Sequence, residues 1–347
     1  MGLPVTLRPY SGELLYSWLS RVAALYRVGM IDLLGPTVPA QELCLEPSVS
    51  TLETLAAVMR LSAPEIRALC VCSNQISQAW WNIRQITPDA FSPEMEYQFR
   101  PAIKFCRVCL WHDFTYEGNE FLRRQWMLCV PTICSIHGMP FEERCRTCLT
   151  LQLPSFVKTG RGFRVTCSNC GTFLAGSEIS LGGAKIAEAS QIKLLQRFEA
   201  VVYDALNNRW NVGFPGASVG PRELLRTVED LLWLITRTVE GFDQMFVHHL
   251  NDTSFRVPRF IYQLPKAHPW LGQFPISTRL GLVSHLAALF GGAAIRQQLF
   301  TDPTVPYALL AGGLKSLVPS DAKQFNQKMA SWPDEHKSLV FGPNYTH

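Results

Sequence analysis

The sequence predicts a mainly α-helical protein whose middle holds a small cysteine-rich module with short β-strands. Two observations predict this class. Apolar residues recur at helical spacing before and after the module, and four pairs of metal-binding side chains are crowded between Cys106 and Cys170. The 347 residues suffice for two or three domains. We expect an N-terminal helical region over 1–100, a tandem metal module over 101–175 and a C-terminal helical domain over 185–347.

The composition excludes a disordered chain and a membrane-spanning one. Hydrophobic residues make up 47% of the sequence, and the mean hydropathy is +0.06. The longest apolar runs, 231–235 and 286–295, are far shorter than the roughly 20 residues that cross a bilayer. The first residues, from Met1 to Val5, lack the basic and apolar regions of a signal peptide. We therefore expect a cytoplasmic protein with reduced cysteines and no membrane contact.

The first predicted helix follows Arg8-Pro9-Tyr10. Ser11 is its expected N-cap, Glu13 suits its positive N-terminal end, and Gly29 is expected to close it. Arg21 lies between apolar positions of this helix and is expected to have a partner that the sequence does not name. The apolar positions at helical spacing are Leu15, Trp18, Leu19, Val22 and Tyr26.

Residues 50–72 are predicted to form a helix-turn-helix. Ser50 with Glu53, and Ser62 with Glu65, have the spacing of a capping box, so each serine is expected to begin a short helix. Two compact helices joined by a tight turn are the skeleton of this DNA-binding motif, but any helical hairpin gives the same pattern. DNA contact, packing and partner binding therefore all fit this unit. Its exposed cations are Arg60 and Arg67.

The cysteine-rich module predicts two structural zinc sites. Each pair leaves two residues between its ligands, so one knuckle turn can present both side chains to one metal. Two such turns complete the tetrahedral shell that Zn²⁺ accepts. An interleaved pairing is geometrically possible, and Cys129 or His112 can replace a first-site ligand, although knuckle spacing favours Cys134. The sequential grouping places Cys106, Cys109, Cys134 and His137 in the first site, and Cys145, Cys148, Cys167 and Cys170 in the second.

A disulfide framework and a catalytic zinc are the competing interpretations of these cysteines. Eleven cysteines are an odd number, and a chain of this length does not need disulfides to stabilise its core. Four protein ligands fill each proposed shell, so neither site leaves a position for a reacting water. No His-x-Glu precedes a Cys-x-x-Cys pair, as the signature of the zinc deaminases requires. The pattern therefore predicts structural metals and no enzyme.

Strands are expected within the second site and helices beyond it. Residues 151–156 and 162–165 flank a glycine turn and are the expected strands of a zinc ribbon. Pro221 is suited to begin a long helix over 224–246, and Ser320 to cap a last helix that stops at Ser331-Trp332-Pro333. The other expected helices are 190–206, 277–290 and 293–300.

Positive charge is too thinly spread for a protein that holds DNA mainly by itself. Residues 1–100 carry seven basic and nine acidic side chains, which favours a protein partner there. Residues 101–170 carry nine basic and five acidic ones, an excess that zinc-bound thiolates largely cancel. A solvated turn at 123–124 and an ordered aromatic loop over 251–275 fit as well as nucleic-acid contact does. The candidate contacts are Arg60, Arg67, Arg123, Arg124, Arg256, Arg259, Lys266 and Arg279.

Three features of the sequence resemble the TniQ/TnsD family of transposition target-selection proteins. One is the order of the four ligand pairs, and another is the late helix that stops at Ser331-Trp332-Pro333. The likeness is good over 8–30 and 101–175, and the rest agrees by general layout. The sequence departs from the pattern at Cys129, which duplicates ligand chemistry. The third feature is the opening Arg8-Pro9-Tyr10 with Gly12-Glu13-Leu14-Leu15-Tyr16-Ser17-Trp18-Leu19-Ser20-Arg21.

The resemblance implies an adaptor in DNA transposition that has no chemistry of its own. Family members select the insertion site and recruit an AAA+ ATPase regulator, which in turn engages the transposase. Some read an attachment sequence in target DNA, whereas others, often as homodimers, dock on an RNA-guided CRISPR effector such as Cascade. The competing class is an autonomous zinc-containing transcription regulator with sequence-specific DNA binding, which would need a basic recognition helix.

Overall fold

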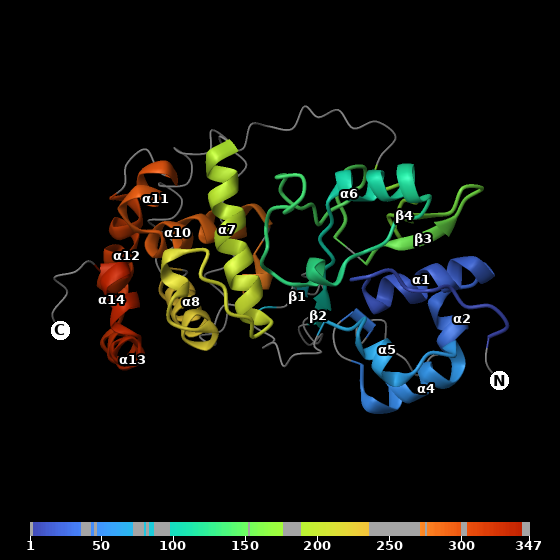
Figure 1. Ribbon diagram of the computed structural model, residues 1–347, viewed down its shortest axis with the longest axis horizontal. Helices are drawn as coiled ribbons and strands as arrows, with labels where there is room; N and C mark the ends of the chain where they lie inside the picture. Colours follow the sequence, from blue (N-terminus) through green and yellow to red (C-terminus); the bar gives the residue numbers. More distant parts are fainter. Residues whose placement is uncertain are drawn as a thin grey trace, which may run out of the picture. The chain divides into compact units, whose positions relative to one another are not determined.

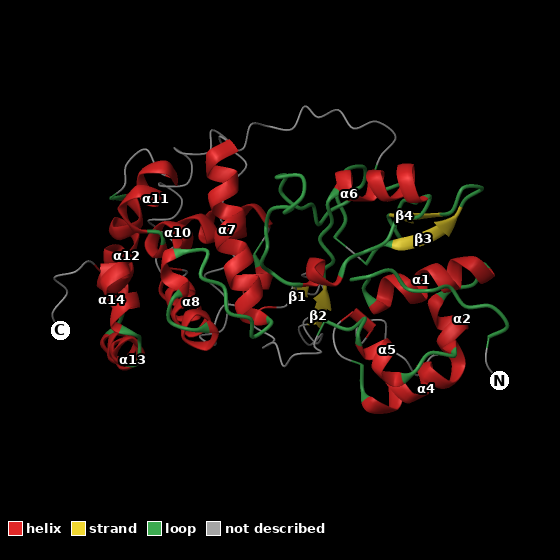
Figure 2. Cartoon of the chain, in the orientation of Figure 1, coloured by secondary structure: helices red, strands yellow, loops and turns green. Residues whose placement is uncertain are grey.

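The computed structural model describes most of the chain. The described residues are 3–35, 43–44, 47–71, 80, 83–86, 98–151, 153–175, 189–235, 271–274, 276–299 and 304–341. They are mostly helical with little strand, as the sequence predicts (Figure 2). The chain divides into two compact units, Met1–Cys129 with Phe141–Leu181 and Val130–Pro140 with Gly182–His347. The division into three domains stays a prediction.

The first unit begins with α1 (Leu15–Tyr26) and the short α2 (Met30–Leu34) (Figure 1). Leu14 is the N-cap of α1, so the predicted cap Ser11 is wrong. The reason is that Glu13 bridges to Arg123 and the Leu14 N–H donates to the Leu122 carbonyl at 2.9 Å, which keeps the chain extended up to Leu14. The predicted closing role of Gly29 is also wrong.

The end of α1 is set by Arg27, which has left-handed backbone geometry with a φ of 57°. Gly29 instead precedes α2 as its N-cap, and its N–H donates to the Asp32 carboxylate at 3.1 Å. An arginine thus occupies the conformation for which glycine was expected.

The predicted helical hairpin consists of α4 (Val49–Met59) and α5 (Ala63–Arg67), which pack against each other. Ser48 caps α4 by accepting a hydrogen bond from the Thr51 N–H, so the predicted box at Ser50 is wrong because Ser50 already lies in the helix. The box of Ser62 and Glu65 is confirmed. The apolar side chains buried in the hairpin are Leu52, Leu55, Met59, Ile66, Leu69 and Cys70.

The cysteine-rich part follows the antiparallel strands β1 (Ile83–Ile86) and β2 (Gln98–Pro101). It contains α6 (Arg107–His112), the π-helical turn η2 (Asp113–Glu117) and the 3₁₀ turn η3 (Arg124–Met127). The hairpin of β3 (Ser155–Lys158) and β4 (Phe163–Thr166) pairs Ser155 with Thr166. It forms the expected ribbon, although its first strand begins later than predicted.

The second unit is a helical bundle in which α7 (Ala189–Leu206), α8 (Pro221–Ile235) and α10 (Ile276–Phe290) lie side by side (Figure 1). Phe198 of α7 lies 6.1 Å from Phe290 of α10 between ring centroids, and both side chains are buried. The predicted continuation of α8 over 236–246 lies outside the described residues. The other described elements are η4 (Pro215–Ala217), η6 (Leu271–Gln273), α11 (Gly292–Leu299), α12 (Val305–Ser316), α13 (Pro319–Ala330) and α14 (Asp334–Phe341).

The last predicted helix ends as expected, because Ser331 is the C-cap of α13. Its predicted cap Ser320 is wrong, since Val318 is the N-cap and Pro319 is already helical. Trp332 follows and donates its indole N–H to Asp230 of α8 at 3.0 Å, and Lys328 donates to the same carboxylate at 2.6 Å. Among the helices that the structure describes, none is long and apolar enough to cross a membrane.

Candidate metal centres

Three of the four ligand pairs lie in knuckle turns of the same geometry. In each turn, the N–H four residues after the first cysteine donates to the carbonyl of that cysteine, at 2.8 or 2.9 Å. An antiparallel bridge then closes the turn between the residue before this cysteine and the residue six positions after it. This backbone arrangement presents the ligands i and i+3 together. The turns start at Cys134, Cys145 and Cys167, and their donors are Gly138, Leu149 and Gly171.

The donor position requires left-handed backbone geometry in all three turns. The φ angles are 64° at Gly138, 57° at Leu149 and 72° at Gly171. Glycine adopts this region without steric cost, whereas a residue with a Cβ is strained there. Leu149 therefore holds its turn against a local preference, which indicates that the rest of the site determines the conformation.

The fourth pair uses a helix instead of a knuckle turn. Cys106 is the N-cap of α6 and Cys109 lies in the first turn of that helix, where residues three apart share a face. The preceding residue, Phe105, exchanges two backbone hydrogen bonds with Glu142, at 2.8 and 2.9 Å. This pairing fixes the entry of the chain into α6 and so the direction of both thiols.

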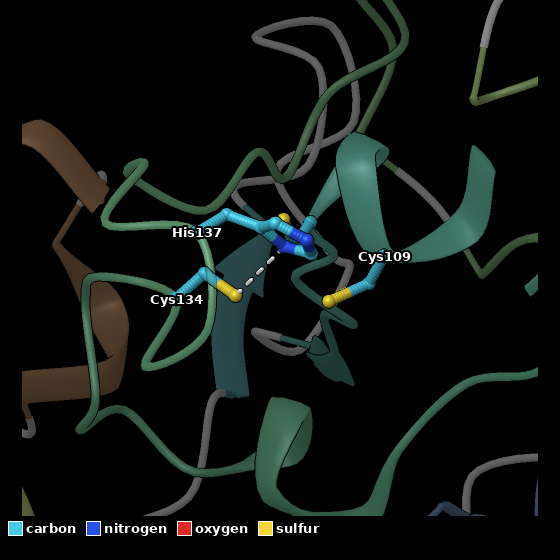
Figure 3. A group of neighbouring side chains, drawn as sticks. Cys109, Cys134 and His137 are labelled. Atoms are coloured by element: carbon cyan, nitrogen blue, oxygen red, sulfur yellow. Dashed lines mark hydrogen bonds between the residues drawn. The ribbon is translucent and has the colours of Figure 1, made fainter. Parts of the chain in front are cut away.

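The first ligand set gathers Cys106, Cys109, Cys134 and His137, with their ligand atoms within 4.8 Å of one another. The Sγ atom of Cys134 lies 3.5 Å from Nδ1 of His137, and Figure 3 shows the side chains of Cys109, Cys134 and His137 directed toward a common point. The three cysteines are buried and the histidine is half-exposed. Soft thiolates with one imidazole form a donor set that suits Zn²⁺.

The second ligand set gathers Cys145, Cys148, Cys167 and Cys170 within the same limit of 4.8 Å. The Sγ atoms of Cys145 and Cys170 are 3.6 Å apart, and those of Cys148 and Cys167 are 3.5 Å apart. Four sulfurs about 2.3 Å from one zinc would be about 3.7 Å from each other, so the geometry fits a tetrahedral ion. No disulfide joins the cysteines that the structure describes, and these Sγ separations are far longer than the roughly 2 Å of a disulfide bond.

Hydrogen bonds favour the thiolate form at two positions of the second set. Bonds from the hydroxyl and the N–H of Thr150 lower the pKa of Cys148 to about 5. Hydrogen bonding with Thr172 lowers the pKa of Cys170, whereas burial raises the pKa of Cys167 to about 11. Because the thiolate is the form that binds metal, the half-buried Cys148 and the exposed Cys170 are prepared for an ion, and the buried Cys167 thiol would be deprotonated by it.

The alternative ligands Cys129 and His112 belong to neither of the two groups found among the described residues. Cys129 is buried, and its N–H donates to the Trp80 carbonyl at 2.8 Å. The imidazole of His112 packs against the rings of Trp111 and Tyr116, at 5.2 and 5.6 Å between ring centroids. The grouping thus follows the sequential pairing.

The candidate nucleic-acid contacts differ widely in their environment. Arg60 and Arg67 are exposed on the helical hairpin. Arg123 makes two hydrogen bonds to Asp113, at 2.9 and 2.8 Å, and Arg124 donates to the Ala68 carbonyl. These two side chains therefore have partners inside the protein. Arg256, Arg259 and Lys266 lie outside the described residues.

Arg279 corrects one prediction, because it is 0% exposed within the second unit. A fully buried guanidinium cannot reach a phosphate or a base. The sequence placed this residue correctly on a helix, α10, but its apolar neighbours along that helix are buried as well. A charged side chain is not exposed by its charge alone, because here the packing of α10 within the bundle removes it from solvent.

Three buried carboxylates form ion pairs or hydrogen bonds near the metal ligands or the N-terminal helix. The sequence did not predict these interactions. Glu120 and Glu199 have no local motif, because their partners lie 44 and 67 positions away in the sequence, whereas the partner of Glu13 lies only eight positions away. Glu13 binds Arg21, Glu120 binds Arg164, and Glu199 binds the backbone at Thr132. The sequence indicated one of these interactions only through Arg21, which was expected to have a partner and pairs with Glu13.

The fold and the ligand geometry define a helical protein with two Cys/His sets of the zinc-knuckle type. The sequence model of the TniQ family matches residues 4–141, which contain the N-terminal helices, the helical hairpin and the whole first ligand set. This part of the chain is therefore a TniQ domain, and the resemblance is confirmed there. The match points to a role in transposition-associated target selection. Comparison with curated proteins found no match.

Proposed function

We propose that this protein is a non-enzymatic adaptor that selects target sites in DNA transposition. The match of residues 4–141 to the TniQ family carries this proposal. In this function the protein links a target-recognition element to an AAA+ transposition regulator. That element is attachment-site DNA, or an RNA-guided CRISPR effector of the Cascade type on which the protein acts as a homodimer.

Both ligand sets are proposed to hold Zn²⁺ in a structural role. Four protein ligands would fill each tetrahedral shell, so the metal would stabilise the fold and leave no position for a substrate or a reacting water. The eight side chains are Cys106, Cys109, Cys134 and His137, and Cys145, Cys148, Cys167 and Cys170. Metal sites that only stabilise the fold are more typical of an adaptor protein than of a zinc enzyme.

The helical hairpin is the proposed site of DNA contact if the protein reads DNA itself. Arg60 and Arg67 are its exposed cations, and the hairpin is otherwise held by a buried apolar face. Two cations supply few phosphate contacts, so binding by this hairpin alone would be weak and sensitive to salt. The low density of positive charge favours a protein or ribonucleoprotein partner for the N-terminal region.

The test is selection of fragmented genomic DNA by the purified protein at near-physiological salt, together with a binding assay against the AAA+ regulator. Enrichment of one site that is lost in the Arg60→Ala, Arg67→Ala double variant supports direct reading. The matched control is Lys323→Ala, which removes an exposed cation of α13. Regulator binding without enrichment supports targeting through another complex. A protein that selects a site but does not bind the regulator would be a transcription regulator, and the proposal would fail.

A further inference from the structure

One face of α7 contacts the turn that carries two ligands of the first set. Ile192, Gln196 and Glu199 are four and three residues apart, so they form one stripe along the helix. The facing segment, 132–138, belongs to the same compact unit as α7 and contains Cys134 and His137. All three side chains of the stripe meet this segment.

Glu199 binds the segment where it enters the turn. One carboxylate oxygen accepts the Thr132 N–H at 2.6 Å and also the Thr132 hydroxyl, and the other accepts the Ile133 N–H at 3.2 Å. The Glu199 residue is 1% exposed and Thr132 is 0% exposed. Hydrogen bonds from N–H groups to an ionised acceptor are about twice as strong as neutral ones, so this carboxylate fixes the backbone just before Cys134.

Gln196 and Ile192 bind the turn itself. The Gln196 amide donates to the carbonyls of Cys134 and Ser135, at 2.9 and 3.3 Å. The Cys134 carbonyl also accepts the Gly138 N–H, so this hydrogen bond holds the turn by the atom that closes it. A Cβ at Gly138 would lie 3.2 Å from Cγ2 of Ile192, which shows that the turn rests directly on the helix.

We propose that Glu199 and Gln196 are positioning residues for the first metal site. They hold the turn of Cys134 and His137 in the conformation that presents both ligands, so metal retention at this site depends on α7. A turn that is ordered in advance need not be ordered by the metal, which slows metal loss. The inference rests on the proposed zinc occupancy of this ligand set.

The test compares zinc release to a chromogenic chelator from the full chain and from Glu199→Gln and Gln196→Ala. Lys193→Ala, on the exposed side of the same helix, is the matched control. The background variant Cys170→Ser removes the second site, so the remaining zinc belongs to the first. In this background we expect release from the first site to become about 10- to 100-fold faster in Glu199→Gln and to stay unchanged in Lys193→Ala.

A purely structural role would lower the thermal midpoint and leave zinc release from the folded protein as it was, and that result would overturn the inference. If Glu199→Gln does not fold by circular dichroism, Gln196→Ala decides, because its half-exposed side chain is tolerant of truncation. Unchanged release in Gln196→Ala would then overturn the inference as well. A wild-type chain that binds no zinc would instead overturn the zinc assignment itself.

Discussion

Arg21 and Glu13 form a buried ion pair, with Nη2 of Arg21 2.6 Å from Oε2 of Glu13 and side chains that are 3% and 0% exposed. Glu13 also accepts hydrogen bonds from the Ser17 hydroxyl at 2.8 Å and from the Tyr10 N–H at 2.9 Å. The guanidinium of Arg21 lies 4.5 Å from the centroid of the Tyr10 ring. These residues all belong to the 8–21 stretch that resembles the TniQ family, so the stretch has a structural role at the start of α1.

Removing one partner of this pair is expected to be costly. Arg21→Ala should lower the free energy of unfolding by roughly 3–5 kcal/mol, because the Glu13 carboxylate would remain buried without its counter-charge. The measurement is urea denaturation of the zinc-bound protein. Lys337→Ala is the control, since its partner Asp334 is 99% exposed and the loss should stay below about 1 kcal/mol. Equal losses of unfolding free energy in Arg21→Ala and Lys337→Ala would contradict a strongly stabilising role for the buried pair of Arg21 and Glu13.

Glu120 is expected to make stability depend on pH. Its side chain is 0% exposed, and burial raises its pKa to about 7, although hydrogen bonds from the Val165 N–H and the charge of Arg164 act in the opposite direction. Because the folded pKa lies above the ordinary value of 4.5, the protein binds this proton more tightly when folded. The stabilisation is therefore complete below pH 4.5 and is lost as pH rises through about 7.

The variant Glu120→Gln removes this titration and keeps a hydrogen-bond acceptor. From about pH 5.5 to 8, we expect the thermal midpoint of the wild type to fall relative to that of the variant. The measurement is the difference between the two midpoints, with zinc present at each pH. A difference that is constant over this range would show that Glu120 does not titrate there.

Zinc content should separate the ligands from their neighbours. Cys134→Ser and Cys145→Ser are each expected to reduce the metal from two ions per chain to one, whereas Cys129→Ser should retain both. Apparent zinc-binding energies of roughly 10–16 kcal/mol in zinc-finger peptides imply that each loss will also unfold the surrounding turns. Elemental analysis measures the zinc content, and amide exchange at Gly138 for Cys134→Ser and at Leu149 for Cys145→Ser measures the unfolding of each turn. Zinc loss in Cys129→Ser alone would reassign the first site.

The strained position in the second site is expected to be improved by glycine. Leu149→Gly should stabilise the zinc-bound protein by up to about 1 kcal/mol, because Leu149 has a φ of 57° and is 66% exposed. Gly171→Ala is the reverse test, since no atom lies within 4 Å of the added Cβ and backbone strain alone should cost about 1 kcal/mol. Thermal midpoints measure both, and shifts of the same sign would refute the strain argument.

Features that depend on neighbouring residues follow from local sequence patterns alone. The two-residue spacing within each ligand pair predicted the sets that the structure gathers, because a knuckle turn or one turn of helix brings residues three apart together without help from a distant segment. Helical periodicity located α7, α10 and the end of α13, and the capping box of Ser62 and Glu65 located α5. The glycine turn within the second site located the β3–β4 hairpin.

The burial of charged side chains, and the partners they bind, depend on long-range packing that local patterns do not report. Glu120 with Arg164 and Glu199 with Thr132 are paired through contacts between distant segments that no local pattern encodes. The cap of α1 shifted from Ser11 to Leu14 for the same reason, since the chain there pairs with residues more than 100 positions away. Sequence spacing and capping residues indicate which local conformation a short segment prefers. The burial of a charged side chain instead depends on which distant segments pack over it and exclude water.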